Sequence, residues 1–187
     1  MQMPKTAYQK YVVLGILEIR PTAGSEMKRC IREYFCNGLE VDENAVSPAL
    51  RALAAEGLVS REVHQEKAGR ARNVYSLTSR GEQELKRWLH SPEEKDRDLL
   101  LKCVFGYGIP PGTMKEKIRA FRTRCEAEVT SIETKESRIA SLPDTAIEKP
   151  FLRSVARFEL MKYIAHLDWA QETLSMLETL EVPGREA

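Results

Sequence analysis

Apolar residues recur at helical spacing through three segments at the start of the chain, and the pattern then changes to that of short strands. The helical segments are residues 8–20, residues 26–35 and a third segment that ends before Gly57. Pro21 ends the first helix, since proline cannot continue one, and Asp42 or Asn44 can cap the third. The chain therefore begins with three successive helices.

The segment after the third helix predicts a β-hairpin. Two short apolar runs, residues 58–63 and 74–77, flank the polar stretch 65–72. Thr78 then supplies a hydroxyl cap for a further helix, which closes near Pro92. Three helices, a two-stranded hairpin and another helix, in this order, are the plan of a winged helix-turn-helix domain, in which the third helix presents its outer face to the DNA major groove.

The second half of the chain is helical in pattern, apart from the glycines and prolines of residues 106–112. Two long apolar stripes follow, one starting at Met114 and the other at Phe151. Helices of this length usually bury such stripes in a partner, which favours a homodimer, although an intramolecular hairpin remains an alternative. We expect a mainly α protein, with a DNA-binding domain over residues 1–92 and a helical dimerisation domain over residues 93–187.

Composition narrows the class of function. Of 187 residues, 42% are hydrophobic and 30% are charged, and the net charge is only +1. Nucleic-acid binding would therefore depend on a local basic patch rather than on a polybasic chain. The sequence has no apolar run long enough to cross a bilayer, and residues 1–10 do not look like a signal peptide, so a cytoplasmic location is expected.

No enzymatic chemistry is indicated. The sequence contains no glycine-rich phosphate loop, and its three histidines and four cysteines lack the spacing of a metal or redox site. A weak redox alternative remains for Cys30 and Cys36, whereas the apolar periodicity around Cys125 predicts simple burial. We expect no cofactor, no metal and no enzyme activity.

Several stretches resemble the PadR family of transcriptional regulators, which is named for repressors that respond to phenolic acids. The resemblance lies in residues 14–17, 48–59 and 69–81, and in the stretch 99–111. It covers nearly the whole chain. It implies a winged helix-turn-helix with a C-terminal helical dimerisation domain.

Two positions depart from the family pattern. Family members usually carry a tyrosine before the proline of the recognition helix and often an aromatic residue after the first helix-turn glycine, whereas this chain has Ser47 and Ser25 there. A serine can bond a phosphate oxygen or a base edge, but it lacks the reach and apolar surface of tyrosine. A different DNA contact or a different target sequence would follow.

Six residues are expected to bind DNA, three of them placed by the resemblance and three by the local positive charge of the hairpin. Asn44, Ser47 and Arg51 are expected on the exposed side of the third helix, where Arg51 could bond guanine. The remaining three are Lys67, Arg70 and Arg72, which are expected to lie at the hairpin tip and to contact DNA phosphates. A solvated helix arginine and a solubilising loop are the alternative explanations.

These features predict a sequence-specific transcriptional regulator, expected to be a repressor, that binds double-stranded DNA as a homodimer on an inverted repeat. The family also implies a small aromatic effector. Four aromatic residues could line a cavity for it: Phe105, Tyr107, Tyr163 and Trp169. Aromatic residues at helical spacing more often belong to a core. The alternative function is a winged-helix module that binds protein and lacks specific DNA binding, which the neutral charge and the two serines would suit.

Overall fold

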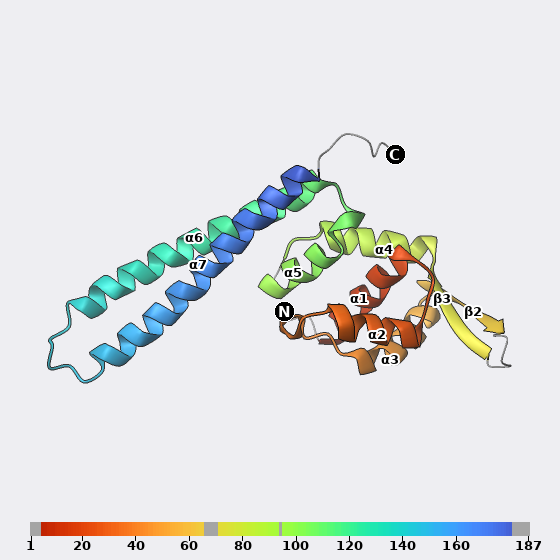
Figure 1. Ribbon diagram of the computed structural model, residues 1–187, viewed down its shortest axis with the longest axis horizontal. Coiled ribbons are helices and arrows are strands. Elements are labelled where there is room, and N and C mark those ends of the chain that lie inside the picture. Colours follow the sequence, from red (N-terminus) through yellow and green to blue (C-terminus); the bar gives the residue numbers. More distant parts are fainter. Residues whose placement is uncertain (1–4, 66–70, 94, 181–187) are drawn as a thin grey trace. The chain divides into compact units, whose positions relative to one another are not determined.

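The computed structural model describes residues 5–65, 71–93 and 95–180 and divides into two compact units, residues 1–109 and 110–187 (Figure 1). The first unit is a set of helices with a small sheet. Its elements in chain order are α1 (Lys5–Ile19), β1 (Thr22–Ala23), α2 (Gly24–Tyr34), the short 3₁₀ helices η1 (Asn37–Leu39) and η2 (Glu43–Ala45), α3 (Val46–Ala55), β2 (Val59–Gln65), β3 (Ala71–Leu77), α4 (Ser79–His90), α5 (Asp96–Val104) and η3 (Gly106–Gly108).

Helix α1 forms the centre of the first unit, because most of its surface is apolar. Val12, Val13 and Leu14 are fully buried, and the helix contacts α3, α4 and β3. Leu50 and Leu53 of α3 complete this core from the other side. The core fixes the face of α3 that points inward and therefore also the face that remains in solvent.

Side-chain caps fix the starts of two helical segments, as the sequence predicts. The carboxylate of Asp42 accepts a hydrogen bond of 2.8 Å from the backbone N–H of Asn44. The hydroxyl of Thr78 accepts one of 3.2 Å from the N–H of Gly81 at the start of α4. Pro48 lies in the first turn of α3, where the N–H that proline lacks would have no helical partner.

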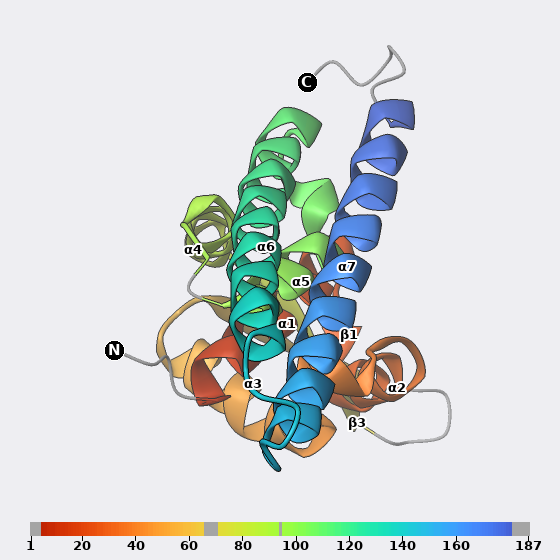
Figure 2. The ribbon, with the colours of Figure 1, turned by 90° about the vertical axis from the view of Figure 1, so that its left-hand side faces the viewer.

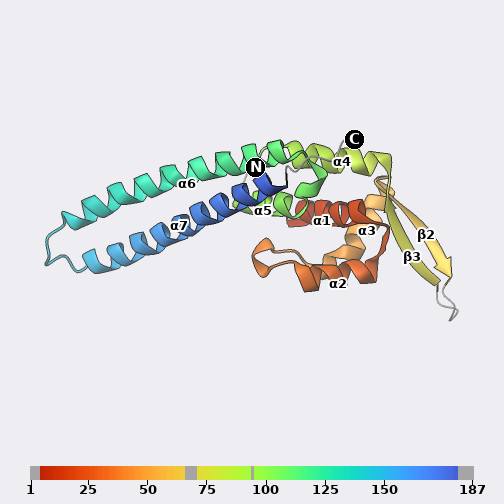
Figure 3. The same ribbon diagram turned by 45° about the horizontal axis from the view of Figure 1, so that its top comes forward.

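The sheet is antiparallel, with strand order β1-β3-β2. Strands β2 and β3 form the predicted hairpin, from the pair Val59 and Leu77 out to Gln65 and Ala71. This ribbon extends beyond the helices of its unit as a wing (Figure 3). The third strand is an addition to the prediction, because Thr22 and Ala23, which lie between the first two predicted helices, pair with β3.

Helix α5 and η3 belong to the first unit and contact helix α1. The Tyr107 hydroxyl donates a hydrogen bond of 2.9 Å to the carbonyl of Gly15, and Arg97 lies 4.1 Å above the Tyr8 ring. Contacts therefore divide the chain after residue 109, later than the boundary at residue 92 that the sequence favours.

The second unit is a pair of long helices, α6 (Pro111–Ala140) and α7 (Lys149–Thr179), which lie side by side (Figure 2). This confirms the two predicted long helices. Its buried apolar residues include Phe121, Cys125 and Ile132 of α6 and Leu174 and Leu177 of α7. Within the described part of the chain, no helix has the length and apolar character needed to cross a membrane.

Candidate nucleic-acid interface

A groove of about 520 Å³ lies between the start of α2, the outer face of α3 and the base of the wing. We call it the basic groove. Its described lining residues are Ala23, Gly24, Ser25, Lys28, Ser47, Leu50, Arg51, Arg61, Arg72, Asn73 and Tyr75.

Positive charge dominates the basic groove. Four of its lining residues are cations, one each from α2, α3, β2 and β3: Lys28, Arg51, Arg61 and Arg72. None of the described lining residues is an acid. The whole chain has a net charge of only +1, so this is a local concentration of charge on an otherwise balanced molecule. Such a concave basic surface attracts a phosphate backbone.

The structure brings three of the six predicted residues into the basic groove. Ser47 and Arg51 are exposed and lie one turn apart on α3, so their side chains share a face. Arg72 also lines the groove, but it belongs to strand β3 rather than to the hairpin tip.

Of the other three predicted residues, the structure describes only Asn44, which is not among the described residues that line the groove. Asn44 is exposed in η2, next to the start of α3. Lys67 and Arg70 fall outside the described residues. The contact of all six with DNA stays a prediction.

Sequence reasoning missed several groove residues, and strand register could have identified some of them. Arg61 pairs directly with Tyr75, so both side chains lie on one face of the ribbon, and Asn73 shares that face two residues further along. Lys28 is one turn into α2, and its nearness to the wing depends on the tertiary fold.

Arg72 is held by an acid at the edge of the groove. Its Nη2 atom lies 2.7 Å from Oε1 of Glu26, in the first turn of α2. The side chains are 33% and 30% exposed, so the ion pair is partly shielded from solvent. The hydrogen bond from Arg72 is the main cause that lowers the pKa of Glu26 below its ordinary value, against the opposing effect of burial.

The four aromatic residues considered for an effector cavity have contacts within their own units. Phe105 lies 6.2 Å from Phe35 between ring centres, and Tyr107 is bonded to Gly15. In the second unit, Trp169 contacts Phe121 edge-on at 5.5 Å, and Tyr163 contacts His166 edge-on at 5.7 Å. Phe105 is buried, whereas Tyr107 remains 56% exposed, so these contacts do not by themselves form an enclosed aromatic cavity.

The helix pair α2 and α3 followed by a β-hairpin wing defines a winged helix-turn-helix protein. Comparison with protein families agrees. Residues 13–87 match the model of the transcriptional regulator PadR-like family, and residues 97–178 match the model described as virulence activator alpha C-term. The first unit of the chain is therefore similar to the PadR-like family of transcriptional regulators over residues 13–87.

Similar solved structures come from several bacteria. The PadR-like transcriptional regulator BC1756 from Bacillus cereus is 24% identical, with 94% of this chain and 98% of that chain covered and a TM-score of 0.44. Bacillus subtilis PadR in complex with operator DNA is 19% identical, with 90% and 98% covered and a TM-score of 0.40. The Vibrio cholerae virulence activator AphA is 20% identical, with 92% and 99% covered and a TM-score of 0.38. No curated protein matches the chain.

Proposed function

We propose that this chain regulates transcription by binding a specific duplex DNA sequence in the basic groove. The observation that supports it is the convergence of Lys28, Arg51 and Arg61, from three elements, on one concave surface with no acid among its described lining residues; the fourth cation, Arg72, is already paired with Glu26. A winged helix-turn-helix puts the outer face of its second helix in the major groove, and that face of α3 carries Ser47 and Arg51.

The groove residues divide into two roles in this proposal. Arg51 bonds the edge of a guanine, which discriminates against other bases by about 1–3 kcal/mol, and Ser47 bonds a base edge or a phosphate. Lys28 and Arg61 neutralise phosphates. Asn44, next to the start of α3, is a further phosphate contact.

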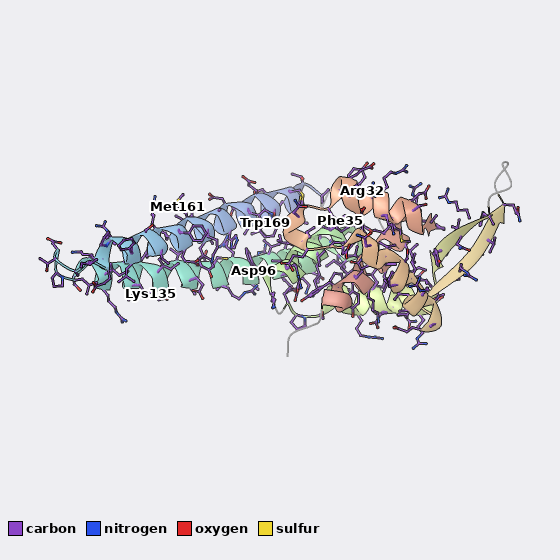
Figure 4. All side chains as sticks on the ribbon, turned by 90° about the horizontal axis from the view of Figure 1, so that it is seen from below. Arg32, Phe35, Asp96, Lys135, Met161 and Trp169 are labelled. Atoms are coloured by element: carbon purple, nitrogen blue, oxygen red, sulfur yellow. The ribbon has the colours of Figure 1, made fainter. Side chains whose placement is uncertain are left out.

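We propose that the active form is a homodimer held by α7. A row of large apolar side chains along the first half of α7 remains in solvent, although α6 packs beside it. This α7 apolar row consists of Phe151, Val155, Phe158, Met161 and Ile164, with Met161 labelled in Figure 4. Phe151 and Phe158 are 70% and 66% exposed, which is costly for phenylalanine unless a partner covers it.

A dimer would bind two half-sites related by a twofold axis, about one helical turn apart, so the operator is expected to be an inverted repeat.

We further propose that the protein acts as a repressor and that a small aromatic effector releases it from DNA. An effector does so only if it binds the free form more tightly than the DNA-bound form. Titration of the preformed complex with phenolic acids tests this step.

The decisive experiment is selection from a pool of random duplexes at about physiological salt, followed by sequencing of the retained DNA. We expect enrichment of an inverted repeat. The Arg61→Gln variant should then weaken binding to all sequences and reduce the salt slope by about one unit, whereas Arg51→Gln should relax preference at one base pair. Lys86→Gln, which removes an exposed charge from α4, is the matched control and should change neither quantity.

The opposite outcome would support the other candidate function. If no sequence is enriched and no duplex binds even at low salt, the winged helix is a protein-interaction module, in agreement with the serines at positions 25 and 47.

A further inference from the structure

The ion pair between Glu26 and Arg72 joins two elements that the backbone connects only through a very short ladder. Strand β1 pairs with β3 at two positions, Thr22 with Tyr75 and Ala23 with Val74. Arg72 is two residues further out along β3 than Val74, and Glu26 is in the first turn of the helix that follows β1. The side-chain contact thus continues the connection between α2 and the wing beyond the last backbone pair.

Beyond this ion pair, the described part of the wing has backbone pairing only within itself. His64 pairs with Arg72 and Gln65 with Ala71, both within the β2–β3 ribbon. A two-stranded ribbon bends and twists easily when nothing holds it at the side. The Glu26–Arg72 contact is therefore placed to fix the direction in which the wing leaves the helices.

The local environment of Glu26 suits such a role. It lies at the N-terminal end of α2, where a carboxylate is favoured by the helix dipole, and the backbone amide of Ala23 also lowers its pKa. Glu26 is thus held by its own helix as well as by Arg72. A carboxylate held from both sides can transmit the position of α2 to the wing.

We propose that Glu26 is a positioning residue for DNA binding: through Arg72 it holds the wing at the angle at which α3 and the ribbon contact the same duplex. This inference rests on the proposed function. It assigns an acid a favourable role at a DNA-binding surface, where charge alone predicts the reverse. It also means that Arg72 acts mainly through Glu26, since its charge is already balanced in the free protein.

Repulsion of phosphates and positioning of the wing predict opposite changes in DNA affinity for the same substitution of Glu26. If Glu26 only repels phosphates, Glu26→Gln strengthens binding. If Glu26 positions the wing, the same change weakens binding to the selected operator by about fivefold, the effect of losing a partly shielded ion pair. Glu62→Gln is the matched control, because Glu62 is an exposed acid on the same ribbon, at a position that does not line the basic groove. This control should bind at least as tightly as the wild type.

A second variant separates position from charge and from folding. Glu26→Asp keeps the negative charge at the helix end but withdraws the carboxylate from Arg72 by about one methylene, so it should weaken operator binding in the same way. In both variants, amide hydrogen exchange at Arg72 and Val74 should accelerate, while the thermal unfolding of the protein changes little. Because the pair acts as one unit, Arg72→Gln should weaken operator binding less in the Glu26→Gln background than it does in the wild type. The double variant should therefore bind more tightly than the sum of the two single effects predicts.

The outcomes are distinguishable. Wild-type protein that binds no duplex at low salt overturns the proposed function itself. Wild-type protein that binds its operator, together with Glu26→Gln protein that binds as tightly or more tightly, overturns only the positioning role. Loss of operator binding by Glu26→Gln and Glu26→Asp, with Glu62→Gln unaffected and the wing amides less protected, supports it.

Discussion

The backbone of Gly15 lies directly against the ring of Phe105. A Cβ atom at position 15 would overlap three carbons of that ring. The adjoining Tyr107 hydroxyl bonds the Gly15 carbonyl at 2.9 Å, so two side chains from the segment after α5 are fitted to one residue of α1. Glycine costs stability in the middle of a helix, and here the close approach of Phe105 explains its presence.

Substitution of Gly15 by alanine should therefore destabilise the protein. The overlap with the buried Phe105 ring costs about 3 kcal/mol, and the better helix propensity of alanine returns about 1, which leaves a net loss of about 2 kcal/mol. Urea unfolding measures this difference. Gly112→Ala is the control, because a Cβ there has no neighbour within 4 Å, and it should not lower stability.

Lys102 should be more costly to replace than its acidic partner. Its side chain is 1% exposed, and Nζ lies 3.0 Å from the Glu93 carboxylate, 2.5 Å from the Ser91 carbonyl and 3.2 Å from the Ser91 hydroxyl. Lys102→Met leaves a buried carboxylate without this partner and should cost about 3–5 kcal/mol, whereas after Glu93→Gln the lysine keeps its bonds to Ser91. Unfolding of both variants and of the double variant, which should be more stable than Lys102→Met alone, tests this order.

Stability should fall at high pH in part because of Tyr107. Partial burial of Tyr107, which is still 56% exposed, and then the nearby Glu18 and Cys30 raise its pKa from 10.0 to about 12. The folded protein thus keeps a proton that the unfolded chain loses, so this contribution is complete below pH 10 and disappears as pH rises towards 12. Tyr107→Phe should flatten the decline of unfolding free energy across that range.

The control for the alkaline measurement is Tyr34→Phe, because Tyr34 is 77% exposed. An equal flattening in this variant would argue against Tyr107 as the source. Ultraviolet titration of tyrosinate in the folded protein provides an independent check.

The α7 apolar row should determine the oligomeric state. Phe158→Glu places a charge on a side chain that is 66% exposed in the single chain, so the fold should persist while self-association is lost. Sedimentation should show a monomer, and affinity for an inverted repeat should fall by at least about tenfold, because the two half-sites are no longer bound together. Ser175→Glu, at an exposed polar position of the same helix, should remain associated.

Local signals in the sequence predict the helices and the hairpin. Asp42 and Thr78 cap the segments they are expected to cap, and apolar spacing gives α6 and α7. The same reasoning cannot identify β1, because two residues carry no periodic pattern and their partners are about fifty residues away. Local patterns also cannot predict how α5 packs against α1, because this packing depends on the close approach of Phe105 to Gly15, which lies far away in the sequence.

The candidate site is predictable only where one element supplies it. Ser47 and Arg51 share a helix face, so their helical spacing is sufficient to pair them. Lys28 and Arg61 join them through packing of separate elements, which no local pattern encodes. Arg72 was expected at a free tip, whereas its pairing with Glu26 requires two segments distant in sequence to meet.

The two-residue strand β1 also sets an order of events during folding. Thr22 cannot pair until Tyr75 is available, so the sheet closes a loop that contains α2, α3 and β2. Closing such a loop has an entropic cost before any contact compensates for it, which slows folding relative to local helix formation. During synthesis, α1 and α2 leave the ribosome long before β3, and the DNA-binding unit must wait for its last strand.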